Sequence, residues 1–369
     1  MASAKLSGFG LYRYELPLSE PLTLKGTVLH YREGLLLELA GEGGLVGRGE
    51  ASPLPGFSRE SLHDAARQLR GLASSMVGRE VTDNLVDPDG DLDRELDSMH
   101  LAPSVRFGLE LALLDLYAQS RKRPLAELLT PRPRATVPVS AMISGPPDEA
   151  LKEASRLRSA GYEAVKLKVG ARAVEEDVEL VHAVNGVLGG AVTLRLDANR
   201  AWSLEEAERF ARGTAALHFE YVEEPLADPA QLSSFARASG VPVAVDESLA
   251  GMEPEALEDY GYARAAVLKP TLVGGISRTL RFAKRASDLG VQPVVSSAYE
   301  TGIGTAALVA LAAGVGDEGV PAGLDTYRRL AEDLLRPRLE LPAPRVEVRA
   351  GARREIERRL LSPVGDIGL

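Results

Sequence analysis

The chain has 369 residues, more than one compact core usually accommodates, so we expect two domains, one of which would suit a barrel. Its formal net charge of -10 disfavours nucleic acid or an anionic membrane as a main partner, because both attract clustered Lys and Arg. It has no cysteine, which excludes a disulfide framework and a thiolate site, and neither a signal pattern nor a membrane-spanning apolar run, so we expect a cytoplasmic protein.

The first 130 residues are predicted to form an α+β domain, because strand patterns come first and helix patterns follow. The expected strands run over 8–16, 26–31, 34–42 and 45–50. A loop of turn-forming residues at 52–57 comes next, and apolar residues at helical spacing predict helices over 59–77 and 103–129. The Pro/Arg-rich stretch 130–134 is the expected linker to a second domain.

Short apolar strands alternate with amphipathic helices over residues 135–330. The expected strands cover 137–143, 164–168, 192–197, 219–223, 241–246, 265–269, 291–296 and 322–325. This α/β alternation predicts a TIM-type (β/α)7β barrel. A doubly wound open sheet shares the alternation but normally has a Gly-rich phosphate turn after its first strand, which we do not find. The tail 331–369 is expected to pack back onto the first domain and complete it.

The central strands end on polar or charged residues, namely Lys166, Lys168, Asp197, Glu223, Asp246, Lys269, Ser296 and Ser297. In a TIM barrel the carboxyl ends of the strands meet at one mouth, where the active sites of this fold lie. A single acidic strand end is as well explained by a helix N-cap. Three clustered carboxylates repel one another unless a cation lies between them, and an oxygen-only site favours Mg²⁺, with Mn²⁺ able to substitute.

Lys166 and Lys168 lie one residue apart in a predicted strand, so their side chains point to the same face. Two ammonium groups about 7 Å apart repel by roughly 2 kcal/mol, which lowers the pKa of one of them and favours its use as a base. Alone, the pattern is more typical of a solvated strand face. The five histidines lie outside the strand ends, which argues against a Ser-His-Asp hydrolase and a His-rich zinc site.

The motifs at 166–168, 197–199, 223–225, 246–248 and 269–270 resemble, in this order, those of the enolase superfamily, in its muconate-cycloisomerase-like branch. The resemblance covers nearly the whole chain, since that family has an α+β capping domain made of the N-terminal part and the C-terminal tail. Within the branch, four segments are similar to the o-succinylbenzoate synthase family of menaquinone biosynthesis: 52–58, 103–108, 195–202 and 323–326. The segment 296–301 keeps the paired serines of that family and differs beyond them.

The resemblance implies a hydro-lyase that removes a proton α to a carboxylate of a small-molecule substrate. The substrate would be 2-succinyl-6-hydroxy-2,4-cyclohexadiene-1-carboxylate and the product 2-succinylbenzoate. Mg²⁺, or Mn²⁺ in its place, would be bound by Asp197, Glu223 and Asp246, and would stabilise the enediolate. Glu224 and Glu247 are expected to orient these ligands rather than to bind the metal.

The resemblance also assigns roles to the lysines. Lys168 would take the α-proton and return it to the departing hydroxyl, Lys269 would stabilise the anionic intermediate, and Lys166 would lower the pKa of Lys168 and meet the substrate carboxylate. The segments 18–32 and 53–58 of the capping domain are expected to close the pocket. The residues expected to bind the substrate are Arg195, Asn199, Ser296, Ser297, Gly323, Gly56 and Phe57.

Several alternatives remain open at this stage, and the oligomeric state is not predicted. An N-acylamino acid racemase or a dipeptide epimerase would use Lys168 and Lys269 as two bases on opposite faces of its substrate, and the motifs alone do not exclude it. Muconate cycloisomerisation, a Schiff-base lyase on the same barrel, and a barrel retained only for binding are further possibilities.

Overall fold

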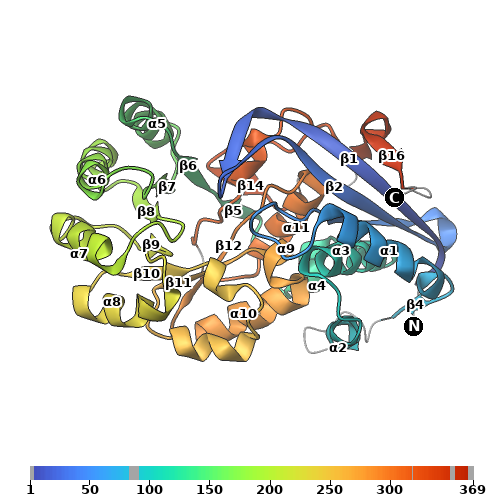
Figure 1. Ribbon diagram of the computed structural model, residues 1–369. Coiled ribbons are helices and arrows are strands. Elements are labelled where there is room, and N and C mark those ends of the chain that lie inside the picture. Colours follow the sequence, from blue (N-terminus) through green and yellow to red (C-terminus); the bar gives the residue numbers. More distant parts are fainter. Residues whose placement is uncertain (1–3, 83–90, 318, 350–353, 365–369) are drawn as a thin grey trace.

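The protein is described by a computed structural model over residues 4–82, 91–317, 319–349 and 354–364. Its long N-terminal strands lie beside a barrel whose outer helices follow one another in chain order (Figure 1). Parts of the predicted capping domain, at 1–3, 83–90, 350–353 and 365–369, lie outside the described residues. The boundary near residue 130 falls between α4 (Leu125–Leu129) and β5 (Thr136–Pro138).

The N-terminal part is built on an antiparallel sheet with the order β16-β1-β2-β3, and β4 also pairs with β1. Its strands are β1 (Ala4–Leu24), β2 (Thr27–Gly41), β3 (Val46–Ala51), β4 (Glu80–Val81) and β16 (Leu361–Pro363). The last of these comes from the C-terminal tail, which therefore extends the N-terminal sheet. Short elements of this part and of the tail are η1 (Glu42–Gly44), β13 (Leu335–Arg336), β14 (Arg345–Glu347), β15 (Glu355–Ile356) and η7 (Arg358–Leu360).

The predicted strands 26–31 and 34–42 are one continuous strand, β2, so the expected break between them is wrong. Gly34, the expected start of the second of these strands, pairs with Tyr14 inside the β1–β2 ladder. A Cβ at Gly34 would lie 2.2 Å from the hydroxyl of Tyr14. The glycine is therefore required by a close side-chain approach within the sheet and not by a turn.

The helices of the cap are α1 (Leu62–Met76), α2 (Asp91–Ser98), α3 (Pro103–Ser120) and α4 (Leu125–Leu129). α1 begins with a capping box, in which the Ser61 hydroxyl accepts a hydrogen bond from the Asp64 amide. The predicted helix 103–129 is divided into α3 and α4, which corrects its expected length. Pro124 explains the break, because proline disfavours a helical conformation in the residue before it.

Helix α3 is buried on nearly every side and packs closely on β3. A Cβ at Gly49 of β3 would lie 1.8 Å from the carbonyl oxygen of Gly108 in α3. We expect Gly49→Ala to lower the free energy of unfolding by about 1–3 kcal/mol, because the helix must move away from the sheet. Urea denaturation measures this. Gly71→Ala in α1 is the control: it meets no atom within 4 Å and should stabilise the protein by about 0.5–1 kcal/mol. Equal stability of the Gly49 variant and the wild type would contradict this packing.

The second part is a parallel barrel, which confirms the predicted fold class. Seven parallel strands follow one another in chain order: β6 (Ser140–Ile143), β7 (Ala164–Lys168), β8 (Thr193–Asp197), β9 (Val222–Glu223), β10 (Val243–Val245), β11 (Ala265–Leu268) and β12 (Gln292–Val295). The eighth barrel strand is reduced to two isolated parallel bridges. They pair Ala322 with Val139 and Gly323 with Ser296, and so close the ring of strands.

The expected first barrel strand, 137–143, is shorter than predicted. β5 (Thr136–Pro138) leaves the barrel and pairs antiparallel with β14 of the tail. The barrel strand β6 begins only at Ser140. Both segments are apolar and extended, so the sequence pattern did not separate them.

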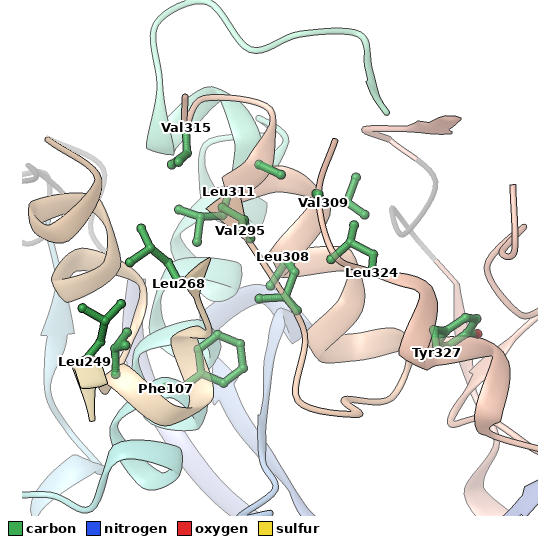
Figure 2. Close-up of a cluster of buried hydrophobic side chains, with 14 of the residues drawn as sticks. Phe107, Leu249, Leu268, Val295, Leu308, Val309, Leu311, Val315, Leu324 and Tyr327 are labelled. Atoms are coloured by element: carbon green, nitrogen blue, oxygen red, sulfur yellow. The ribbon is translucent and has the colours of Figure 1, made fainter. Parts of the chain in front are cut away.

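Helices connect the barrel strands on the outside (Figure 1). They are α5 (Pro147–Ser159), α6 (Val174–Leu188), α7 (Leu204–Gly213), α8 (Leu232–Ser239), α9 (Pro270–Val273), α10 (Ile276–Asp288) and α11 (Gly302–Ala312), with the 3-10 segments η3 (Pro229–Gln231), η4 (Glu247–Leu249), η5 (Pro254–Tyr260) and η6 (Asp325–Arg329). One buried apolar cluster runs through cap and barrel, and includes Phe107 of α3, Leu268 of β11 and Leu308 of α11 (Figure 2). In the described ranges, no helix is both long and apolar enough to cross a membrane.

Candidate active site

The charged strand ends meet at one mouth of the barrel. We call them the strand-end cluster, which consists of Lys166, Lys168, Lys269, Asp197, Glu223 and Asp246. Strand pairing places Lys168 opposite Asp197 and Asp197 opposite Glu223. Asp246 and Lys269 directly follow β10 and β11, the next strands along the sheet.

Two lysines of β7 contact the carboxylates of β8 and β9. Lys166 Nζ lies 3.1 Å from Asp197 Oδ2 and 3.1 Å from Glu223 Oε2, so its ammonium bridges the two acids. Lys168 Nζ lies 2.7 Å from Asp197 Oδ2 and donates to the Asn199 side-chain carbonyl. The Lys168 side chain is 32% exposed and that of Lys166 is 13% exposed. Lys168 is thus the more accessible of the two from the cavity.

The third lysine approaches from the other side of the mouth. Lys269 forms a short ion pair with Asp246. Burial opposes its charge, but the nearby carboxylates raise the pKa of Lys269 above its ordinary value. Glu224 fixes the turn that carries Asp246, because its Oε1 accepts hydrogen bonds from the Asp246 amide at 2.9 Å and the Ser248 amide at 2.7 Å. The Arg200 guanidinium donates to the other oxygen of Glu224 at 2.9 Å.

The strand-end cluster shifts the pKa values of its members in opposite directions. Burial raises the pKa of Glu223 to about 8, and repulsion from Asp197 adds to this effect. Burial also raises the pKa of Asp246. Burial acts on Asp197 in the same sense, but the ammonium groups of Lys166 and Lys168 hold its pKa well below the usual range. Burial lowers the pKa of Lys166, but the nearby carboxylates of Asp197 and Glu223 raise it by more, so the pKa lies above its ordinary value. The attraction of these carboxylates therefore exceeds the lysine–lysine repulsion that was expected from the sequence.

The donor set fits a hard divalent cation. Asp197, Glu223 and Asp246 are almost fully buried and supply only carboxylate oxygens, which suit Mg²⁺ or Mn²⁺. As they stand, no three acidic or histidine side chains in the described ranges are grouped closely enough to hold a metal. The Lys166 ammonium lies between two of the acids, 3.1 Å from an oxygen of Asp197 and 3.1 Å from an oxygen of Glu223. The chemistry of the donor set, three buried carboxylates with no sulfur or imidazole, is what fits a hard cation.

A cavity of about 400 Å³ lies over the strand-end cluster. The β1–β2 hairpin and the loop after β3 form part of its wall, and the barrel forms the rest. The cap contributes Pro21, Leu22, Thr23, Leu24, Lys25, Leu54 and Phe57. The cavity is therefore enclosed by both parts of the chain, as expected for the segments 18–32 and 53–58.

The predicted residues of the seventh and eighth strands lie together on this wall. Ser296, Ser297 and Gly323 all line the cavity. The Ser297 hydroxyl donates to the Gly323 carbonyl at 2.8 Å and shares a 2.6 Å hydrogen bond with Thr326 Oγ1. These contacts order the wall, and a role in substrate binding stays a prediction.

Three other predicted residues, Arg195, Phe57 and Gly56, lie in different surroundings. Arg195 is buried deeper in the barrel, where it donates to Glu220 at 2.6 Å and to the Pro321 carbonyl at 2.7 Å. One of its terminal nitrogens has no partner among the described residues, and the residue lines the cavity. Phe57 lines the cavity beneath Lys25, whose Nζ lies 4.2 Å from the ring centroid. Gly56 forms the neighbouring turn, outside the described wall of the cavity.

Sequence reasoning missed several lining residues. Tyr221 lies two residues before Glu223 in the predicted strand 219–223 and directly precedes β9, so the period of two would have placed it on the same face as Glu223. Asp325 follows the eighth strand, and its burial raises its pKa to about 6. Ser140, the first residue of β6, and Tyr299, in the loop after β12, also line the cavity and were not named. Lys25 lies in the segment 18–32 that was expected to close the pocket.

Comparison with known proteins agrees with the geometry. Residues 149–352 match the family described as enolase C-terminal domain-like, and residues 7–116 match the MenC N-terminal domain. A muconate lactonizing enzyme from Pseudomonas fluorescens, complexed with muconolactone, superimposes with a TM-score of 0.83 at 24% identity, covering 94% of each chain. The capped barrel with lysines and carboxylates at its mouth thus defines an enzyme of the enolase superfamily.

The chain is similar over most of its length to named enzymes of that superfamily. It is 35% identical to the o-succinylbenzoate synthase of Vibrio cholerae serotype O1 (strain M66-2), over 90% of this chain and 92% of the relative. It is 32% identical to the o-succinylbenzoate synthase of Pasteurella multocida (strain Pm70), over 89% of this chain and 92% of the relative. The chain belongs to the o-succinylbenzoate synthase family.

Proposed function

We propose that the protein is an o-succinylbenzoate synthase, a hydro-lyase that converts 2-succinyl-6-hydroxy-2,4-cyclohexadiene-1-carboxylate into 2-succinylbenzoate and water in menaquinone biosynthesis. The observation that carries this proposal is the strand-end cluster, in which Lys168 and Lys269 flank three buried carboxylates at a cavity lined by cap and barrel. Relatives of this name, matched over about nine tenths of the chain, support the same activity.

The charge of the cluster suits an anionic substrate. With Lys168 as the neutral base, two ammonium groups and three carboxylates sum to -1, so one bound divalent cation leaves a net charge of +1. A carboxylate of the cyclohexadiene substrate would therefore meet net positive charge in the site.

Asp197, Glu223 and Asp246 would hold Mg²⁺, with Mn²⁺ as a substitute. When bound, the ion supplies stabilisation of the negative charge that develops on the substrate carboxylate as its α-proton leaves. Glu224 supports this set through the backbone, since its carboxylate holds the amides of Asp246 and Ser248.

Lys168 is the proposed base. Its side chain is the most exposed of the three lysines in the cluster, and it lines the cavity. It takes the α-proton, the ring gains a double bond as the carbon–oxygen bond of the hydroxyl breaks, and the same proton leaves with that hydroxyl as water. Asn199, which accepts a hydrogen bond from Lys168, orients the ammonium.

Lys166 and Lys269 act as fixed positive charges. Both side chains are 13% exposed and are surrounded by carboxylates, which favours their ammonium forms. Lys269 directly follows β11, across the barrel mouth from β7. Its ammonium stabilises the anion formed on that side of the substrate ring. Lys166 meets the substrate carboxylate. A cytoplasmic location, and the lack of nucleic-acid or membrane partners, stay predictions from composition.

The placement of Lys168 and Lys269 on opposite sides of the mouth also suits a racemase of N-acylamino acids, which needs two opposed bases. Incubation in heavy water separates the two functions. We expect the protein to form 2-succinylbenzoate from the cyclohexadiene and to exchange the α-hydrogen of N-succinyl amino acids at least 100-fold more slowly per enzyme, measured by NMR. Fast exchange without aromatic product would overturn the synthase in favour of the racemase.

A further inference from the structure

The guanidinium of Arg32, on β2, lies buried at the junction of cap and barrel. The residue is 2% exposed. Its nitrogens donate to five main-chain carbonyl oxygens, those of Glu33 at 2.9 Å, Pro53 at 2.8 Å, Tyr299 at 3.0 Å, Ala298 at 3.3 Å and Ser52 through a short contact. One side chain thus holds backbone from its own strand, from the loop after β3 and from the loop after β12.

This use of a buried arginine is unusual. Buried cations normally pair with carboxylates, as Arg106 does with Asp93 and Asp97 in the same cap. Among the described residues, no carboxylate forms an ion pair with Arg32. Its hydrogen bonds go to carbonyl oxygens, which have the right geometry only while both loops stay in place.

The loops that Arg32 holds form the cavity wall. Leu54 and Phe57 follow the carbonyls of the first loop, while Ala298 and Tyr299 belong to the second, and all four line the cavity. Leu54, Ala298 and Tyr299 pack together in one small apolar cluster. Tyr299 has a φ of 63°, a conformation that non-glycine residues adopt only where surrounding contacts impose it. The Arg32 bond to its carbonyl is one of those contacts.

The cap holds the same barrel loop from a second side. Glu50 of β3 is fully buried and accepts hydrogen bonds from the Thr301 amide at 2.9 Å, the Thr301 hydroxyl at 2.7 Å and the Gly304 amide at 2.9 Å. Arg32 therefore fixes the carbonyls and Glu50 the amides of one short stretch, 298–304. The residues of the strand-end cluster lie elsewhere, on β7 to β9 and directly after β10 and β11.

We propose that Arg32 is a positioning residue that holds the loops 52–58 and 298–301 closed over the cavity and thereby sets the affinity for substrate. It does not touch the strand-end cluster, so it acts on binding more than on the chemical step. The identity of the substrate in this inference rests on the proposed function; the loop-holding role does not.

Kinetics of two substitutions test the proposal. We expect Arg32→Met to raise KM for the cyclohexadiene about tenfold or more and to change kcat less than about threefold, because misplaced walls weaken binding. Arg32→Lys should lie between this variant and the wild type, since an ammonium has three donors instead of five. Arg106→Met is the matched control: Arg106 is buried to a similar degree, at 4% exposed, but does not contact the cavity, so it should lower stability and leave KM unchanged.

Hydrogen exchange provides a readout that needs no substrate. In Arg32→Met we expect faster amide exchange at 54–58 and 298–304, with the barrel strands β7 to β11 unchanged. Unaltered exchange in both loops, or a KM equal to that of the wild type in an active enzyme, would overturn the role of Arg32. If the wild type has no synthase activity but the loops still exchange faster in the variant, the proposed function fails and the loop-holding role stands.

Discussion

Replacing Lys168 by alanine should lower kcat for 2-succinylbenzoate formation by about 10³-fold, because the proton α to the carboxylate then has no base within reach. The fold should survive the change. Asp197 keeps a second ion-pair partner, the Lys166 ammonium, whose Nζ lies 3.1 Å from Asp197 Oδ2. Steady-state rates follow the aromatic product by absorbance, and circular dichroism confirms folding.

Two comparisons make the Lys168 result specific. Lys152→Ala, on the exposed face of α5, removes a lysine far from the cavity and should leave kcat unchanged. Lys168→Met keeps the length of the side chain without its nitrogen and should be as inactive as the alanine variant. Activity within tenfold of the wild type in either Lys168 variant would show that another group removes the proton.

Replacing Glu223 by glutamine should lower kcat/KM by at least about 100-fold, because one charged ligand of the proposed metal site is lost while the side-chain shape is kept. The Glu223 carboxylate is fully buried between Lys166 and the neighbouring strand end. Removal of divalent metal from the wild type with a chelator should reduce its rate to a similar level, and added Mg²⁺ should restore it.

Thermal unfolding gives a metal readout that is independent of activity. A ligand that binds only the folded state raises Tm with its concentration, so Mg²⁺ should raise the Tm of the wild type. The Glu223→Gln variant should show a much smaller rise at the same Mg²⁺ concentration. An equal rise in both proteins would place the metal elsewhere.

Local periodicity was enough to predict the contents of the strand-end cluster. Lys166 and Lys168 are separated by one residue, so a strand must place both on one face, and parallel strands must bring Asp197 and Glu223 beside them. The barrel and its cap followed from the order of strand and helix patterns. These features depend on short-range spacing, which the sequence shows directly.

Features that depend on long-range packing were not predictable in the same way. The break expected before Gly34 is absent from β2, and the close approach of the Tyr14 hydroxyl that requires this glycine is invisible in the local pattern. Arg195 lines the cavity, and its role in substrate binding stays a prediction; its contacts with Glu220 and Pro321 come from distant segments that the local pattern does not show. Four of the five carbonyl contacts of Arg32 likewise depend on loops that lie far from it in the sequence.

The central claim is that this barrel mouth dehydrates a cyclohexadiene carboxylate, and its most direct measurement is turnover of that substrate. Purified wild-type protein with Mg²⁺ should convert 2-succinyl-6-hydroxy-2,4-cyclohexadiene-1-carboxylate completely into 2-succinylbenzoate, seen as the aromatic product by absorbance and mass spectrometry, while the Lys168→Ala protein gives only the uncatalysed rate. A wild-type rate no faster than that of the Lys168→Ala protein would contradict the account.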